Sequence, residues 1–196
     1  MIYPDIKFGA VRAEEIVIDT LELASRIGAG LNYSNEKIAL CTESFNKSVN
    51  YRYAYVKTPV KVAQSVCDFG FAKVESKNLS DLLCSCDKAF LLAVSAGIGV
   101  DRLITRLEAT SKADAFFTDS IASAAIESFC DYINEKICKG LNCTKRFSPG
   151  YGDVPLAFQK ELLQRLDSPS SVGISLNSSL LMSPMKSITA IIGIKK

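Results

Sequence analysis

The sequence predicts a single mixed α+β domain whose twisted sheet is largely antiparallel and flanked by helices. The chain has 196 residues, of which 48% are hydrophobic, so one core can form without metal or disulfide staples. Helix-like and strand-like segments alternate without the regular βαβ pattern of a parallel sheet. No internal repeat or low-complexity tract divides the chain into smaller units.

The first quarter of the chain is predicted to contain one helix followed by two strands. Apolar residues at helical spacing occupy 19–27, and the glycines Gly28 and Gly30 are expected to end this helix. Short β-prone runs at 37–42 and 51–56 predict strands. In the second run alternate positions are tyrosines that should share one face: Tyr51, Tyr53 and Tyr55.

The next segments are predicted to be a helix, a helical turn and a buried strand. Apolar spacing favours a helix over 59–71, and Ser80 is expected to cap the turn that follows. Residues 88–97 form a short apolar run before glycines, which indicates a buried strand. Asp101 is then expected to open another helix, because its charge suits the positive end of the helix dipole.

The longest predicted helix covers 113–139. Its apolar residues repeat every four positions: Ile121, Ala125, Phe129, Ile133 and Ile137. At 100° per residue, the opposite side collects polar residues: Ser120, Ser123, Glu127, Asp131 and Asn134. Glu127 is therefore expected in the middle of the helix among small neighbours.

After Gly140 the helical pattern gives way to a loop over 141–153, and Pro155 marks the start of another helix. The buried stripe of this helix is expected to contain leucines: Leu156, Leu162, Leu163 and Leu166. The C-terminal part predicts a hairpin of strands 172–182 and 187–194, joined by a turn at 183–185 and lying inside a sheet.

Composition excludes several classes of function. The net charge is +2 without basic clusters, which argues against nucleic-acid or anionic-membrane binding, and no apolar stretch is long enough to span a bilayer. Histidine is absent, so no serine–histidine or cysteine–histidine nucleophile and no imidazole metal ligand can form. The seven cysteines contain no C-x-x-C pair and no secretory leader is visible, which favours a reduced, cytoplasmic protein.

The loop over 146–151 is the most informative segment. Pro149 fixes φ and Gly150 permits a turn that other residues resist, while Arg146 and Tyr151 flank that turn. A guanidinium can bind a carboxylate through two hydrogen bonds, and a tyrosine can pack on a flat ring. These residues would suit a ligand with an amino-acid end and an aromatic end, although taken alone the loop is more typical of an ordinary surface turn.

Three segments resemble the activation (reactivation) domain of cobalamin-dependent methionine synthase, which also occurs in bacteria as a small free-standing protein. They are SAGIGVDRLITRLEATSKADAFFTDSIASAAIESFCDYINEKI, RFSPGYGDVPLAFQKELLQRLD and LLMSPMKSITAIIGI. The resemblance covers 79–196 well and 1–78 only in outline. It implies that the whole chain, 1–196, is one domain that binds S-adenosylmethionine (SAM).

The resemblance also implies site residues. Arg146 and Tyr151 would contact SAM, the backbone near Ser148 and Gly150 would line its site, and Glu127 would be the acidic residue of the pocket. Family members also use an aspartate from the N-terminal part, which has no assignable counterpart here. Those fused to the synthase use a tyrosine segment beyond the last strand as well, whereas this sequence stops at Lys196.

The function implied is reactivation of a cobalamin-binding methionine synthase chain by reductive methylation. Cob(II)alamin on that partner would receive one electron from a flavodoxin or ferredoxin-like donor and a methyl group from SAM, which restores methylcobalamin. The chain would then be part of a methyltransferase. Two alternatives remain open: a non-catalytic module that senses SAM or caps a corrinoid protein, and an activator of another corrinoid methyltransferase. A third alternative is an unrelated cysteine-based redox or structural protein.

Overall fold

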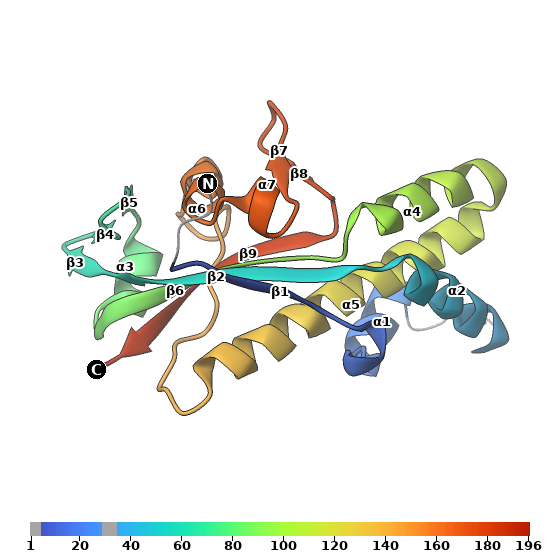
Figure 1. Cartoon of the computed structure of the whole chain (residues 1–196), viewed down its shortest axis with the longest axis horizontal. Helices are drawn as coiled ribbons and strands as arrows, with labels where there is room; N and C mark the ends of the chain where they lie inside the picture. Colours follow the sequence, from blue (N-terminus) through green and yellow to red (C-terminus); the bar gives the residue numbers. More distant parts are fainter. Residues whose placement is uncertain (1–4, 29–34) are drawn as a thin grey trace.

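A computed structural model describes residues 5–28 and 35–196. Its central sheet contains β1 (Lys7–Val11), β2 (Tyr51–Pro59), β6 (Cys86–Ser95) and β9 (Ser187–Lys195), in that spatial order (Figure 1). Each neighbouring pair of these strands is antiparallel. The predicted class, a mixed α+β fold with an antiparallel sheet and flanking helices, is confirmed.

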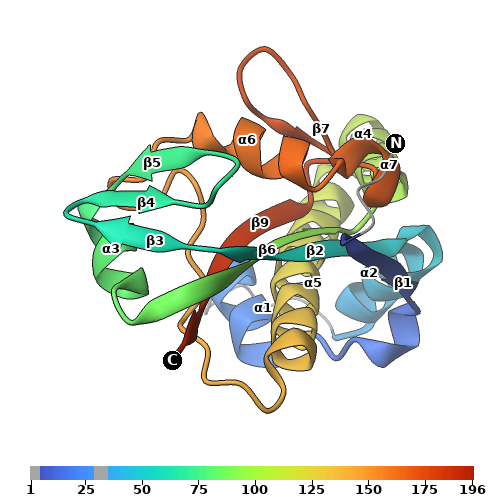
Figure 2. The same cartoon turned by 60° about the vertical axis from the view of Figure 1, so that its left-hand side comes forward.

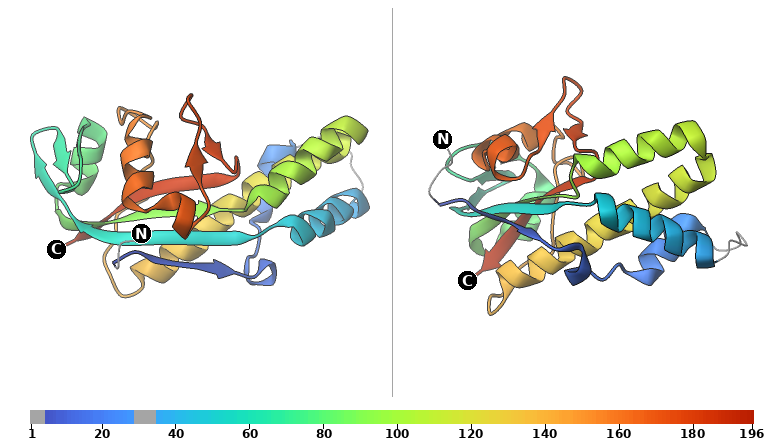
Figure 3. Two further views of the ribbon diagram at one scale, coloured as in Figure 1. Left: turned by 45° about the horizontal axis from the view of Figure 1, so that its top comes forward. Right: turned by 45° about the vertical axis from the view of Figure 1, so that its right-hand side comes forward.

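One face of the sheet is covered by the long helix α5 (Lys112–Cys138), which runs along the strands (Figure 1). Three further helices pack against α5: α1 (Thr20–Ile27), α2 (Asn35–Ser48) and α4 (Ile98–Thr110). Helices α2 and α4 lie beyond one end of the sheet, where they meet the first half of α5 (Figure 3). The core between sheet and helices includes Leu92, Val94 and Phe129, which are fully buried. A short 3₁₀ helix, η1 (Ala13–Glu15), follows β1.

The other face carries shorter elements (Figure 2). They are the helices α3 (Lys77–Leu83), α6 (Phe158–Arg165) and α7 (Ser168–Ser171), the sheet of β3 (Lys61–Ala63), β4 (Val66–Asp68) and β5 (Lys73–Glu75), and the hairpin of β7 (Ser175–Leu176) and β8 (Met182–Ser183). They enclose a second core that contains Leu91, Ala93 and Leu162. Strand β6 is therefore buried on both faces, which explains why it is apolar without alternation.

Several predicted elements are confirmed. The helix over 19–27 is α1, with Asp19 as its N-cap, and it ends at Gly28, whose φ is 92°. Gly30 lies outside the described residues. The strands at 51–56 and 88–97 are β2 and β6, the three tyrosines of β2 all face the α5 side, and the helix over 113–139 is α5.

The strand predicted at 37–42 is wrong, because these residues lie inside helix α2. A run of six residues is too short to separate a period of 3.6 from a period of two. The helix buries Cys41 and Phe45, which are four positions apart and so lie on one face.

The helix predicted over 59–71 is also wrong. The segment contains the end of β2, then β3 and β4, joined by a turn in which Gln64 has a φ of 56°. Val62, Val66 and Phe69 are spaced as in a helix, but Val62 pairs across the turn with Cys67. Spacing alone could not reveal the turn, since glutamine is not a typical residue for a positive φ.

Three details of helix ends and faces need correction. Ser76 rather than Ser80 caps α3, since its Oγ accepts the Leu79 amide at 3.0 Å. Helix α4 begins at Ile98, three residues before Asp101, which lies in its first turn. Leu156 does not belong to the buried stripe of α6, because it is 41% exposed and precedes the helix.

The predicted C-terminal hairpin is wrong in its pairing. Strands β7 and β8 pair with each other, whereas β9 pairs with β6. The turn at 183–185 does occur, with a cis bond between Ser183 and Pro184. Strand β9 was expected inside a sheet, but it is the last strand of the central one. Among the described helices, none has both the length and the apolar character needed to cross a membrane.

Candidate functional site

The loop that follows α5 is fixed to the outer edge of β9. Phe147 and Ile191 exchange both backbone hydrogen bonds, at 2.9 and 2.7 Å. The Thr144 amide donates to the Gly193 carbonyl at 2.9 Å, and Thr144 Oγ1 accepts the Gly193 amide at 2.9 Å. The loop thus protects the exposed edge of the sheet and holds the segment that contains Arg146 in a defined place.

The Pro-Gly turn has the backbone conformation that its sequence predicts. Gly150 has a φ of 90°, which favours glycine, and its amide donates to the Val154 carbonyl at 3.0 Å. A Cβ atom at this position would lie 3.2 Å from a methyl group of Leu156. The turn is closed by the Tyr151 amide, which donates to the Ser148 carbonyl at 3.2 Å.

Asp153 ties the far end of the turn to helix α3. Its carboxylate accepts a hydrogen bond from the Ser76 hydroxyl, one from the Lys77 amide at 2.7 Å and one from the Asn78 amide at 3.3 Å. The Ser76 hydrogen bond, with these amides, lowers the pKa of Asp153. The Pro-Gly turn is therefore held between β9 on one side and α3 on the other.

Arg146 reaches from this loop to α5. Its Nη2 lies 2.8 Å from Asp131 Oδ1 and 3.3 Å from Glu127 Oε2, and its side chain is only 22% exposed. Burial alone would lower the pKa of Arg146, but Cys130, Asp131 and Glu127 together raise it above its ordinary value. The guanidinium therefore stays charged, with two carboxylates beside it.

A cavity of about 730 Å³ lies between α5, this loop, α6 and the segment from β8 into β9. Four of the five predicted site residues line it: Glu127, Arg146, Ser148 and Tyr151. Tyr151 is 69% exposed, which places it at the rim. Gly150 does not line the cavity, and its role is to shape the turn that presents Tyr151. These four residues come from two segments, α5 and the loop over 146–151, which meet at one site.

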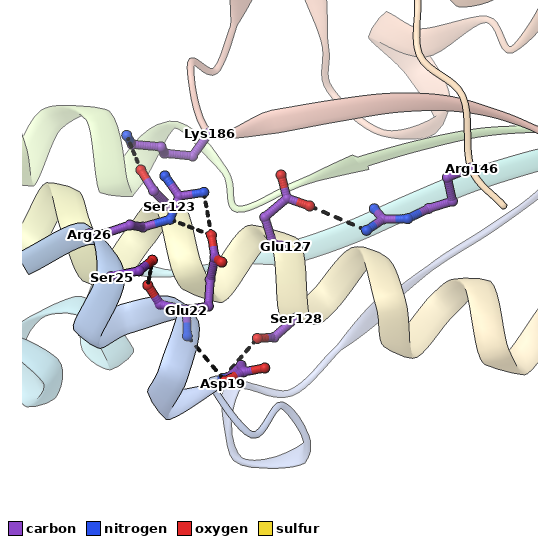
Figure 4. A network of polar contacts seen from close by, with 9 residues as sticks. All are labelled: Asp19, Glu22, Ser25, Arg26, Ser123, Glu127, Ser128, Arg146 and Lys186. Atoms are coloured by element: carbon purple, nitrogen blue, oxygen red, sulfur yellow. Dashed lines mark hydrogen bonds and ion pairs between the residues drawn. The ribbon is translucent and has the colours of Figure 1, made fainter.

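Other lining residues were not predicted from the sequence: Arg26, Ser123, Ile126, Lys145, Phe147, Pro149, Gln159, Met182, Met185, Lys186, Ser187, Ile188 and Thr189. Arg26 comes from α1 and forms an ion pair with Glu22 at 2.7 Å. Lys186 Nζ lies 2.7 Å from Asp119 Oδ1. It also lies 2.8 Å from Ser123 Oγ, a contact drawn in Figure 4. One signal could have identified Lys186, since it is the only charged residue between Asp167 and Lys195.

The N-terminal aspartate that the sequence resemblance implies is not among these lining residues. The described N-terminal part contributes Arg26 instead. Asp19 caps α1, and its backbone amide donates to Ser128 Oγ at 3.0 Å (Figure 4). This contact fastens α1 to α5 and so places Arg26 at the cavity.

Comparison with known proteins gives a match of structure rather than of sequence. No family model matches the chain, and no curated protein matches it significantly. Among solved structures, it is similar to the MetH reactivation domain in its crystal structure bound to AdoHcy. The TM-score is 0.71 at 17% sequence identity, over 96% of this chain and 78% of the other. The likeness therefore extends into residues 1–78, and the chain has the fold of the MetH reactivation domain.

Proposed function

We propose that this chain is a SAM-binding reactivation module that supports reductive methylation of cob(II)alamin on a cobalamin-dependent methionine synthase. The observation that carries the proposal is the meeting of Glu127, Arg146, Ser148 and Tyr151 at one cavity. The fold, shared with a domain whose crystal structure holds AdoHcy, adds to this support. The corrinoid partner is proposed from the sequence resemblance.

The chemistry of the cavity fits the parts of SAM. Arg146 can bind the carboxylate of the ligand, while Glu127 and Asp131 favour its ammonium and sulfonium charges. Both ion pairs of Arg146 use Nη2, and a guanidinium has five N–H donors, so a ligand carboxylate can bind without displacing both partners. Tyr151, at the rim, can contact the bound ligand through its ring face or its hydroxyl.

The reaction needs orientation rather than acid–base chemistry. SAM supplies the methyl group, and the reduced corrinoid on the partner protein is the substrate that accepts it. Because the methyl group leaves a sulfonium by direct displacement, no proton has to move and the absence of histidine is no obstacle. A flavodoxin or ferredoxin-like donor would supply the electron. This chain would hold the methyl group in line with its acceptor and limit access of water.

Calorimetric titration with SAM and AdoHcy tests the binding site. Arg146→Ala should weaken both ligands about tenfold to 150-fold, since it removes a charge-assisted hydrogen bond of about 1.5–3 kcal/mol. Arg102→Ala, an exposed arginine of α4 that does not line the cavity, is the matched control and should bind normally. Unchanged affinity in Arg146→Ala would refute the anchoring role.

A transfer assay tests the reaction itself. The full chain is mixed with a reduced corrinoid protein and SAM that contains a labelled methyl group. Labelled methylcobalamin is expected, and its formation should fall in Arg146→Ala in proportion to ligand affinity. Tight SAM binding without any label transfer would contradict reactivation and point to a module that senses SAM or caps a corrinoid protein.

A further inference from the structure

The cavity has two polar ends, which are arranged along α5. Four side chains with hydrogen-bonding oxygens follow each other at four-residue spacing, about 6 Å apart along one side of the helix: Asp119, Ser123, Glu127 and Asp131. Lys186 contacts the first two and Arg146 contacts the last two. Figure 4 shows the pair of Lys186 and Ser123 at one end of this row and the pair of Glu127 and Arg146 at the other.

The two ends differ in charge. At the Arg146 end one cation faces two carboxylates, which suits a group that brings both a negative and a positive charge. At the Lys186 end the charge of the ammonium is balanced by Asp119, and the third member is the hydroxyl of Ser123. Arg26, which lies near Ser123 in Figure 4, also lines the cavity, and its charge is balanced by Glu22. This end is therefore polar but neutral overall, and it suits an uncharged group with hydrogen-bond acceptors.

Lys186 is held firmly enough to act as a fixed donor. Its side chain is 14% exposed, and its carbonyl accepts the Ala96 amide at 2.9 Å. The preceding Met185 amide donates to Asp101 Oδ2 at 2.8 Å, which ties the corner before β9 to α4. Within the described residues the ammonium has two side-chain partners, which leaves one of its three N–H donors for a ligand.

We propose that Lys186 is a ligand-binding residue that donates to the nucleoside part of the ligand, at the end of the cavity opposite Arg146. This inference rests on the proposed function, because it assumes a ligand made of an amino acid joined to a nucleoside. The acceptors are the uncharged ribose hydroxyls or ring nitrogens. With both donors held in place, the ligand has one orientation along α5, the amino-acid end beside Glu127 and the nucleoside beside Ser123.

Truncated ligands test the orientation. Calorimetry compares AdoHcy with 5′-methylthioadenosine, which keeps the nucleoside and the thioether but lacks the amino-acid end. Lys186→Met should weaken both ligands by about the same factor, of the order of tenfold. Arg146→Ala should weaken only AdoHcy. Lys160→Met, an exposed lysine of α6 outside the cavity, is the matched control for loss of an ammonium.

Two further variants keep the test decisive. Asp119→Asn loosens the hold on Lys186 without removing the amine, so it should weaken both ligands even if Lys186→Met folds poorly. In the double variant of Arg146 and Lys186, the two losses of AdoHcy affinity should add, because the residues contact separate parts of the ligand.

Three results would overturn the inference. They are normal affinity of both ligands in Lys186→Met, loss of AdoHcy alone in that variant, and losses in the double variant that fail to add. Failure of the unaltered chain to bind AdoHcy would refute the proposed function itself, and so it is distinguishable from these results.

Discussion

Replacing Thr144 by valine tests whether the edge of β9 positions the site. Thr144 is buried, and its hydroxyl both accepts the Gly193 amide at 2.9 Å and donates to the Lys145 carbonyl at 2.9 Å. Valine has nearly the same shape but no hydroxyl, so the Gly193 amide is left buried without this partner. Such an unsatisfied donor costs about 1–3 kcal/mol, and we expect the free energy of unfolding to fall by that amount.

Urea denaturation measures the loss of stability, and titration with AdoHcy measures its effect on the site. For a chain of this size each kcal/mol corresponds to about 2–4 °C in the melting temperature. Because Thr144 precedes Arg146 by two residues, the valine variant should also bind AdoHcy more weakly. Thr144→Ser keeps both hydrogen bonds and loses one methyl group, so it should bind normally. Equal unfolding free energies for wild type and Thr144→Val would refute the reasoning.

Two other predictions concern the Pro-Gly turn and the buried thiols. Asp153→Ala removes the acceptor that joins the Pro-Gly turn to α3, so the affinity for AdoHcy should fall. Asp153→Asn keeps an amide oxygen that can accept, so it should retain part of that affinity. Calorimetry that finds equal affinity in Asp153→Ala and wild type would contradict this role of Asp153. Burial raises the pKa of Cys67 from 9.0 to about 11 and that of Cys130 to about 12. The unfolded chain loses these protons at lower pH than the folded chain, so stability should be complete below pH 9 and decline as the pH rises toward 12. Urea unfolding at pH 8 and 10 measures the decline in the free energy of unfolding, which should be smaller in Cys130→Ala. An unfolding free energy that is equal at the two pH values would contradict the prediction.

The sequence was most informative where a pattern extended over many residues. Helix α5 is 27 residues long, so its four-residue period is repeated often enough to exclude other structures. The predicted secondary structure of segments 37–42 and 59–71 was wrong for the opposite reason, since each segment contains only a few apolar residues. Their true structure depends on partners elsewhere in the chain: α2 packs on α5, and β4 pairs with β3 and β5.

The candidate site was predictable only where its signal is local. The Pro-Gly turn can be recognised in the sequence because proline has a fixed φ and the glycine that follows it readily adopts a positive φ. Arg146 and Tyr151 flank this turn in the sequence. Arg26 has no such local signature, and the only signal for Lys186 is that it is the single charged residue between Asp167 and Lys195. Lys186 and Arg26 reach the cavity because β9 pairs with β6 and because α1 is fastened to α5, and both arrangements are tertiary.

The ion pairs of Arg146 with Glu127 and Asp131 determine which kind of ligand binds the cavity most tightly. Arg146 already faces Asp131 and Glu127, so a ligand with a carboxylate alone would exchange one ion pair for another and leave an acidic side chain without its cation. Such an exchange brings little net free energy, since an unpaired and partly buried charge is costly. A ligand that brings an ammonium together with its carboxylate avoids this cost, because the ammonium takes the place of the guanidinium beside Glu127. The arrangement therefore favours zwitterionic amino-acid groups over simple carboxylates.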